Sequence, residues 1–366
     1  MAEPLKNLLH PGLVARMGDI LAAAYPDFDR GRFVAIAVED MASLELMQRA
    51  QQIRAALVET LPKDFPQAAA ILKTSLPSEG NPGLTGWELL PVNQFIAENG
   101  LDHLDLSLDL LKALTPHFTA EFGIRALIHK DQDRSLATIS SWVNDANHHV
   151  RRLASEGTRP RLPWAMRLPA LVRDPQPILP ILTALIDDPE DYVRRSVANS
   201  LNDIAKDHPD LVATFVRDAM IDASPQRRQL LRHASRTLLK KGHGDALANF
   251  GFAPAAGISA GISIETASVI FGEHLSFTLT LCNEGPSPQR LMIDYAVHHR
   301  KANGSLAPKI FKWTSLDLGA GETVVIARRH AMRAITTRQY YPGAHRVEIL
   351  VNGAVLAGGE FELVMS

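Results

Sequence analysis

The spacing of apolar residues in the first part of the chain predicts helices. Leu46, Ala50, Ile53, Leu57 and Leu61 recur every three or four positions among good helix formers, and Pro62 follows directly. Residues at this spacing share one face of a helix, and proline ends it. A second stripe of the same kind begins at Leu101 and runs to about residue 114. The first third of the chain is therefore expected to be mostly helical.

Beyond residue 114 the helical pattern repeats. The segment Trp142–Glu156 contains an apolar helix end, an acidic turn and a helix with paired arginines, and Leu185–Asn199 contains the same features in the same order. A looser copy runs from Ser224 to Ala234. A recurrence of about 40 residues is typical of HEAT-type helical repeats. Because each helix pair has an apolar face that it cannot bury alone, successive pairs are expected to stack.

After Gly242 the spacing of apolar residues changes from the helical period to every second residue, which is typical of β-strands. Apolar residues alternate with polar ones in Leu275–Leu281, and short apolar runs recur at Leu291–Val297, Val324–Ala327 and His345–Val351. Asn352-Gly353 then separates two alternating runs, which is typical of a tight β-hairpin. Six or seven short strands in about a hundred residues predict an immunoglobulin-like sandwich. We therefore expect an all-α repeat domain over residues 1–245, a linker over 246–257 and an all-β sandwich over 258–366.

The repeats also place acids and arginines on helix faces. Arg152 and Glu156 lie four residues apart, and Glu121 and Arg125 have the same spacing. In the second copy, Arg195 and Asn199 are the equivalents, with Asp203 one turn further along. One interpretation is a ridge of carboxylates among arginines that carries chemistry. The other is a set of solvated ion pairs, each worth only about 0.2–0.5 kcal/mol.

Composition and charge narrow the class of protein. The net charge is −2, but residues 151–250 carry sixteen Lys and Arg against twelve Asp and Glu, a local basic field of the kind that a phosphate backbone needs. No apolar run is long enough for a membrane span, and the amino terminus lacks a secretory pattern. Cys282 is the only cysteine, which fits a reducing compartment. A cytoplasmic protein is expected.

Several segments resemble one known family. The stretch Leu153–Trp164, with its Arg-Pro-Arg-Leu-Pro-Trp run, Phe118–Phe122 before it and Tyr192–Lys206 after it closely resemble the AlkC branch of the DNA alkylation-repair glycosylases. The opening Pro4–Leu9 and the stretch Phe65–Leu72 are also similar to that family. The resemblance covers roughly residues 1–245, and some members of the family carry an appended sandwich domain.

The resemblance implies a cofactor-free, monomeric enzyme that excises cationic N-alkylated bases, such as 3-methyladenine or 3-methylcytosine, from duplex DNA, without full base flipping. No metal site is expected, since His148-His149 and His298-His299 have no third ligand at metal spacing. A non-catalytic scaffold that binds DNA or protein is the alternative. The implied catalytic residues are Asp203 and Glu121, ranked first, then Glu156, with Trp164 beside the lesion. The implied DNA-binding residues are Arg152, Arg159, Arg161, Arg194, Arg195, Arg232, Arg300 and Lys301.

The sandwich is expected to contribute to DNA binding through basic loops. His298–Gly304 reads as a basic tip between two strands, and Arg328-Arg329-His330 adds positive charge. The alternative is that these loops are simply solvated. Trp87, in contrast, is expected to belong to the core.

Overall fold

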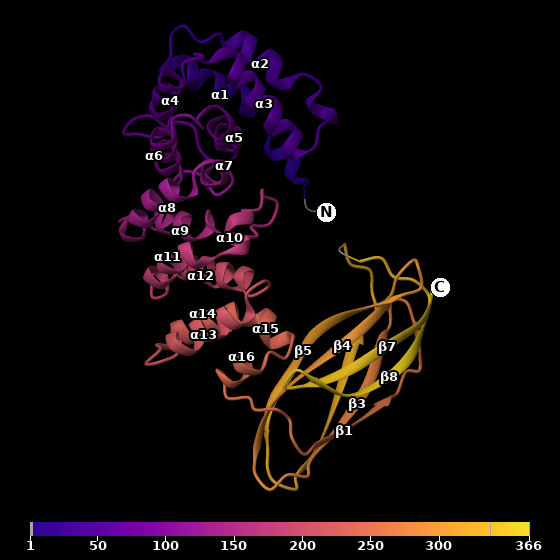
Figure 1. The fold of residues 1–366 in the computed structure, drawn as a ribbon. Coiled ribbons are helices and arrows are strands. Elements are labelled where there is room, and N and C mark those ends of the chain that lie inside the picture. The colour runs from indigo at the N-terminus through magenta and orange to yellow at the C-terminus, as the bar shows by residue number, and fades with distance from the viewer. Residues whose placement is uncertain (1–2, 337, 366) are drawn as a thin grey trace. The chain divides into compact units, whose positions relative to one another are not determined.

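The computed structural model describes residues 3–336 and 338–365, and over these residues the chain divides into two compact units, Met1–Asp207 and His208–Ser366. The expected fold class is confirmed, because a helix-rich region precedes a β-sheet domain (Figure 1). The division differs from the expected boundary at residue 245, since the last four helices group with the sandwich. No helix over the described residues is long and apolar enough to span a membrane.

The first unit is built of helices that follow one another in pairs. The α-helices are α1 (Pro11–Ala24), α2 (Arg30–Val38), α3 (Leu46–Thr60), α4 (Phe65–Thr74), α5 (Leu89–Asn99), α6 (Leu104–Leu114), α7 (Ile124–Lys130), α8 (Gln132–Ser141), α9 (His148–Glu156), α10 (Pro169–Arg173), α11 (Leu179–Leu185) and α12 (Asp191–Ile204). Short 3-10 helices are η1 (Leu5–Leu8), η2 (Met41–Ser43), η3 (Gly86–Glu88), η4 (Trp142–Asn144) and η5 (Gln176–Ile178).

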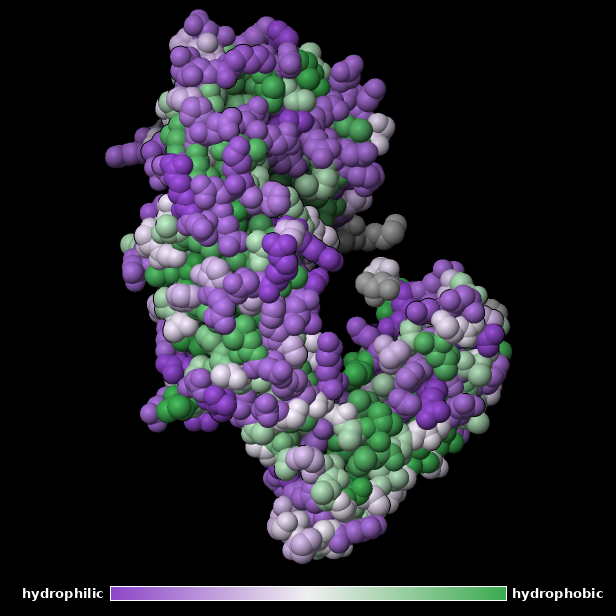
Figure 2. All heavy atoms as spheres, viewed as in Figure 1, coloured by the Kyte–Doolittle hydropathy of each residue, from purple (hydrophilic) through white to green (hydrophobic). Residues whose placement is uncertain are grey.

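The two sequence copies form equivalent helices, α9 and α12, which pack against each other. Asn147 starts α9 by accepting a hydrogen bond from the backbone N–H of His149. The buried hydroxyls of Ser155 and Ser196 hydrogen-bond at 2.6 Å across the α9–α12 contact. Figure 2 shows hydrophilic and hydrophobic side chains side by side on the visible surface of the helical region. Stacking of successive repeats thus positions the acids and arginines that they carry.

The second unit combines four helices with two β-sheets. Its helices are α13 (Pro209–Ala219), α14 (Pro225–Ala234), α15 (Arg236–Lys240) and α16 (Gly244–Ala248). Its strands are β1 (Ile258–Ile264), β2 (Ser268–Ile270), β3 (His274–Asn283), β4 (Gln289–Arg300), β5 (Leu306–Leu318), β6 (Thr323–Ala331), β7 (Gly343–Val351) and β8 (Ala354–Val364). The strand orders are β1-β3-β6 and β2-β8-β7-β4-β5, and a shared apolar core contains side chains from both sheets.

The predicted Asn352-Gly353 hairpin turn is present, with both residues at positive φ, 46° and 81°. The Asn352 side chain also ties the preceding segment to the sheet, because its amide donates to the carbonyl oxygens of Ala253 and Arg290. Phe252 is 1% exposed and packs with Leu239, Leu247 and Met292. Much of the expected linker is therefore packed structure.

The basic tip that was expected at His298–Gly304 is smaller in the structure. His298 and His299 lie inside β4, and the turn to β5 begins only at Lys301. Burial, with Arg338 nearby, lowers the pKa of His299 to about 3, and burial lowers the pKa of His330 to about 4. Both imidazoles are therefore neutral at physiological pH. The positive charge of this tip comes from Arg300 and Lys301.

Acid is expected to destabilise the sandwich because of these histidines. Their pKa values lie below the ordinary 6.5 of an unfolded chain, so the unfolded state binds more protons as the pH falls. The stability that they contribute is present above about pH 6.5 and decreases toward about pH 4. Urea unfolding should show a loss of about 2–4 kcal/mol between about pH 7.5 and about pH 5. His299→Asn should flatten this dependence, whereas replacing the exposed His129 should not; an equal slope in both variants would contradict the assignment.

Candidate active site

The paired arginines of the repeats have different roles. Arg151 binds Asp188 of the next repeat through two hydrogen bonds, at 2.6 and 3.1 Å, and donates to the carbonyl oxygens of Asp145 and Ala146. Arg194 likewise donates to carbonyl oxygens in the turn before its own helix, those of Asp188 and Pro189. The first arginine of each pair therefore holds the repeat together.

The second arginine of the first copy, Arg152, lies between two carboxylates. It donates to Oε2 of Glu121 at 2.5 Å and approaches Oε1 of Glu156 at 3.4 Å. Its guanidinium also lies over the ring of Tyr192, 4.8 Å from the centroid, and contacts the hydroxyl of Thr119. A cation held on an aromatic face and by two acids is fixed in position. Arg152 thus joins Glu121, in the turn before α7, to Glu156 at the end of α9.

Arg159 continues this network into the interior. It donates to Glu156 at 2.6 Å and to Asp203 at 2.9 Å, and only 6% of the residue is exposed. Lys206 also forms an ion pair with Asp203, with its Nζ 2.8 Å from Oδ1 of the carboxylate. Burial by itself lowers the pKa of Arg159, but the charges of Glu156 and Asp203 outweigh burial and raise it. Glu121, Glu156 and Asp203 are therefore linked by an alternating chain of arginines.

The structure does not contain two of the expected arrangements, the face shared by Arg195 and Asp203 and the pair of Glu121 with Arg125. Asp203 is 2% exposed, whereas Arg195 is exposed and binds Asp191 at 2.6 Å. Positions 195 and 203 are eight residues apart, and an α-helix turns by about 80° beyond two full turns over that span, so they lie on different faces. Glu121 precedes α7 in a turn and does not pair with Arg125, because the i,i+4 rule holds only within a helix.

Arg125 instead holds the loop that follows α9. The residue is fully buried and donates to the carbonyl oxygens of Gly157, Arg159 and Met166, at 3.0, 2.8 and 2.5 Å. Burial, with Arg159 nearby, lowers its pKa to about 10, so it stays charged at neutral pH. Its three bonds join both ends of the segment 157–166. Gly157 is required at the start, since a Cβ there would lie 2.7 Å from Ile124.

Trp164 lies at the tip of this loop and is held away from the protein interior. It is 92% exposed, and its φ of 61° is in the left-handed region, which a bulky side chain rarely adopts. A backbone in a strained conformation costs stability, and such outliers often occur at ligand-binding sites. Trp164 is therefore a candidate for contact with a ligand.

Three of the expected catalytic residues line one cleft of about 510 Å³ within the first unit. Glu121, Glu156 and Trp164 lie along it, together with Arg159, while Asp203 lies behind Arg159 and does not reach it. The other lining residues are mainly apolar: Leu5, Leu46, Met47, Trp87, Leu90, Phe118, Thr119, Phe122, Leu162 and Pro163. The cleft thus brings two carboxylates to an aromatic, apolar surface.

The aromatic wall of this cleft was not expected from the sequence. Trp87 is partly exposed and packs against Phe118, with ring centroids 5.4 Å apart. The loop 78–86 that precedes it has no periodic pattern, so nothing in the sequence indicated which way the ring would point. A partly buried aromatic pair beside carboxylates suits a flat cationic ligand.

The remaining expected DNA-binding residues are dispersed. Arg161 makes a two-pronged ion pair with Asp207, both bonds at 2.7 Å. Arg194 is held by the turn carbonyls, and Arg195 is exposed on α12. In the second unit, Arg232 lies on α14, Arg300 ends β4 and Lys301 starts the β4–β5 turn. The structure gathers Arg152 and Arg159 on the carboxylates of Glu121 and Glu156. Of these two arginines only Arg159 lines the cleft, and the other expected DNA-binding residues lie at separate positions.

Comparison with known proteins identifies the relatives of this chain. Residues 117–238 match the family model described as DNA alkylation repair enzyme, and residues 259–365 match the C-terminal Ig-like domain of the YhaZ protein. The YhaZ protein of Bacillus subtilis is 37% identical over 361 residues, which cover 98% of this chain and 99% of that protein. The alkylpurine DNA glycosylase AlkC of Pseudomonas fluorescens, solved bound to DNA with an abasic-site analog, superposes with a TM-score of 0.86 at 37% identity. That match covers 99% of this chain and 100% of the other.

Proposed function

This chain belongs to the AlkC family of DNA alkylation repair glycosylases, and on that premise we propose that it hydrolyses the N-glycosidic bond of cationic N-alkylated bases, such as 3-methyladenine, in duplex DNA. The observation that supports this most is the placement of Glu121 and Glu156 beside the exposed ring of Trp164 on one cleft. Measuring release of free alkylated base from methylated duplex tests the proposal.

The charge of the lesion determines what the site must supply. A cationic base leaves as a neutral molecule, so it needs no proton from an acid. The C1′–N bond breaks with its electron pair going to the base, and positive charge develops on the sugar. Water then bonds to C1′ and loses a proton. Carboxylates beside the sugar stabilise the developing charge and accept that proton.

Glu121 and Glu156 are suited to these two roles. Arg152 holds one oxygen of each, Oε2 of Glu121 and Oε1 of Glu156. The other oxygen of each carboxylate has no hydrogen bond within the described part of the chain, so it is available to water or sugar. Fixed carboxylates need no rearrangement during the reaction, which is the condition for strong electrostatic stabilisation.

We further propose that excision proceeds without full extrusion of the base. Trp164 is almost fully exposed on a loop. It therefore meets a duplex at the protein surface, where its ring can lie against the sugar or the cationic base. Full flipping instead needs an enclosed pocket that stacks the extruded base.

Asp203 acts in this proposal as a positioning residue, because it contacts Arg159 and not the cleft. Asp203→Asn should slow excision by about 10- to 100-fold, since displaced catalytic groups lose rate steeply. Because Asp203 is buried in an ion pair, the change should also cost about 1–3 kcal/mol of unfolding free energy. Single-turnover excision and urea unfolding measure the two effects. Wild-type excision by a folded Asp203→Asn protein would contradict the role.

A further inference from the structure

Tyr192 contacts the network of carboxylates and arginines from the repeat that follows it. It lies in the first turn of α12, and 41% of the residue is exposed. The equivalent residue of the first copy is His149, since each precedes a valine and a pair of arginines. The rings of these two residues pack edge to face, with centroids 5.8 Å apart. Equivalent positions of neighbouring repeats are therefore in direct contact beside the network.

The ring of Tyr192 covers one face of the Arg152 guanidinium, whose central carbon lies 4.8 Å from the ring centroid. The edges of the same guanidinium are directed at other groups, since Nη1 donates to Glu121 and Thr119 and Nη2 lies 3.4 Å from Glu156. Only 14% of the Arg152 side chain is exposed, and a cation is attracted more strongly to an aromatic face where water is excluded. The ring therefore fixes the plane of the guanidinium, while the acids fix its edges.

The placement of Glu121 depends on this guanidinium. Glu121 precedes α7 in a turn, so no helix orients its side chain. Its Oε2 is held by the hydroxyl of Thr119, at 2.7 Å, and by Arg152, at 2.5 Å. Arg152 also approaches Glu156 at the end of α9. A tilt of the guanidinium would therefore move the groups that the reaction needs, and displaced catalytic groups lose rate steeply.

The contact is made by the ring of Tyr192 and not by a charged phenolate. Burial raises the pKa of Tyr192, against the opposing effect of Arg152, so the phenol is neutral at physiological pH. A neutral phenol attracts the guanidinium through its aromatic face. Phenylalanine has the same face, whereas leucine has comparable bulk without it. The two replacements therefore separate the effect of the ring from that of the hydroxyl.

Tyr192 is not among the residues that line the active-site cleft. It borders a smaller pocket of about 220 Å³, together with His117, His149 and Arg152. Burial lowers the pKa of both histidines, so their imidazoles are neutral at physiological pH. Arg152 is then the only charged residue among those that line this pocket. Tyr192 therefore meets the candidate active site through Arg152 and not from within the cleft.

We propose that Tyr192 is a positioning residue of the active site, whose ring holds Arg152 so that Glu121 and Glu156 keep the placement that excision needs. The inference rests on the proposed function, because it takes these two carboxylates as the catalytic groups. The turn before α7, helix α9 and helix α12 each supply one part of the arrangement. The packing of α12 against α9 thus completes a site whose acids come from the preceding elements.

The test compares Tyr192→Phe with Tyr192→Leu in the full chain. Phenylalanine should keep excision of 3-methyladenine within about twofold of wild type, because the ring face remains. Leucine should slow single-turnover excision at saturating enzyme about 3- to 30-fold. The enzyme concentration that gives half the maximal rate should change less than about twofold, because the lost contact positions the acids and does not bind the duplex. A wild-type rate with leucine, or equal losses in both variants, would overturn the proposal.

A double-mutant cycle determines whether the ring acts through Arg152. Tyr192→Leu should slow the Arg152→Gln protein by less than about twofold, because no guanidinium remains for the ring to hold. The same substitution in the wild-type background should give the larger loss stated above. Equal losses in the two backgrounds would mean that Tyr192 acts independently of Arg152, for example by touching DNA directly, and the positioning role would be wrong.

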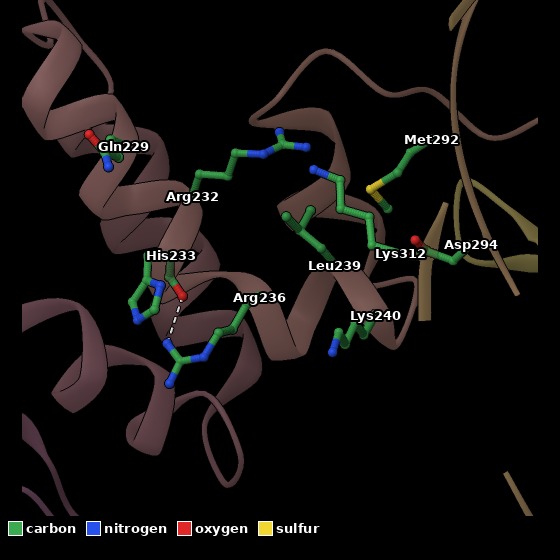
Figure 3. A pocket seen from close by; sticks show the side chains of 9 residues that line it. All are labelled: Gln229, Arg232, His233, Arg236, Leu239, Lys240, Met292, Asp294 and Lys312. Atoms are coloured by element: carbon green, nitrogen blue, oxygen red, sulfur yellow. Dashed lines mark hydrogen bonds between the residues drawn. The ribbon is translucent and has the colours of Figure 1, made fainter. Parts of the chain in front are cut away.

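An arginine on an aromatic face in the second unit supplies a matched control. Figure 3 shows Arg232, which extends from α14 and lies 5.6 Å from the centroid of the Phe250 ring. Both residues belong to the second unit, whereas Glu121 and Glu156 belong to the first. Phe250→Leu should therefore excise at the wild-type single-turnover rate. A loss as large as that of Tyr192→Leu would show that the effect is not specific to the site and would overturn the proposal.

Circular dichroism and urea unfolding check the fold of each variant. Tyr192 is 41% exposed, so the leucine variant should fold; if it does not, Tyr192→Gln replaces it with the same expected loss of rate. A folded wild-type chain that releases no base would overturn the proposed function and this role with it. Normal release by the wild type, together with equal release by the Tyr192→Leu protein, would overturn this role alone.

Discussion

Glu121→Gln is expected to slow release of 3-methyladenine from duplex DNA by about 100- to 1,000-fold, comparable with the loss of one preorganised electrostatic group in other active sites. Glutamine keeps the size of the side chain and one oxygen that accepts the hydrogen bonds from Thr119 and Arg152. What it loses is the negative charge next to the sugar. Single-turnover rates at saturating enzyme isolate this chemical step from binding.

The matched control for Glu121 is Asp191→Asn. Asp191 is an exposed acid that also pairs with an arginine, Arg195, but it does not line the cleft. The control should excise at the wild-type rate, and both variants should bind undamaged duplex as the wild type does or slightly more tightly. A Glu121→Gln protein that excises within about twofold of wild type would exclude Glu121 from catalysis.

Trp164→Gly is expected to reduce excision by about 10- to 100-fold, because stacking on an aromatic ring and its attraction for a cationic base are together worth about 1–3 kcal/mol. The substitution should not destabilise the fold. The side chain is 92% exposed, and glycine adopts the positive φ of this position without the strain that tryptophan carries. The unfolding midpoint should therefore be unchanged or higher.

Thermal unfolding and excision of the same Trp164→Gly preparation test this combination. Met166→Ala is the control, since Met166 is an exposed apolar residue of the same loop that does not line the cleft. It should change neither property. A marked loss of stability in Trp164→Gly would mean that the ring supports the loop, and normal excision would mean that it does not contact the substrate.

The repeat architecture and the hairpin could be predicted because both depend on local patterns. Trp142–Glu156 and Leu185–Asn199 form equivalent helices because they share an acidic turn and apolar spacing. Asn352-Gly353 forms its turn because these two residues adopt positive φ readily. The spacing of Arg152 and Glu156 also indicated their contact correctly.

The network of the site depends on contacts between repeats, which local spacing does not specify. Arg159 reaches Asp203 across 44 residues of sequence, and Arg152 reaches Glu121 across 31. Spacing within one helix predicted instead a face shared by Arg195 and Asp203 and a Glu121–Arg125 pair. The burial of His299 was also missed, because a histidine pair at the end of a strand looks the same in sequence whether it is solvated or packed.

The most direct measurement is the release of free base from methylated duplex by the full chain, followed by chromatography. We expect free 3-methyladenine and a duplex with an intact backbone and an abasic site, at a rate far above spontaneous loss and far above that of the Glu121→Gln protein. Binding of the duplex without any release of base, by a folded wild-type protein, would contradict the proposed catalysis and indicate a DNA-binding scaffold.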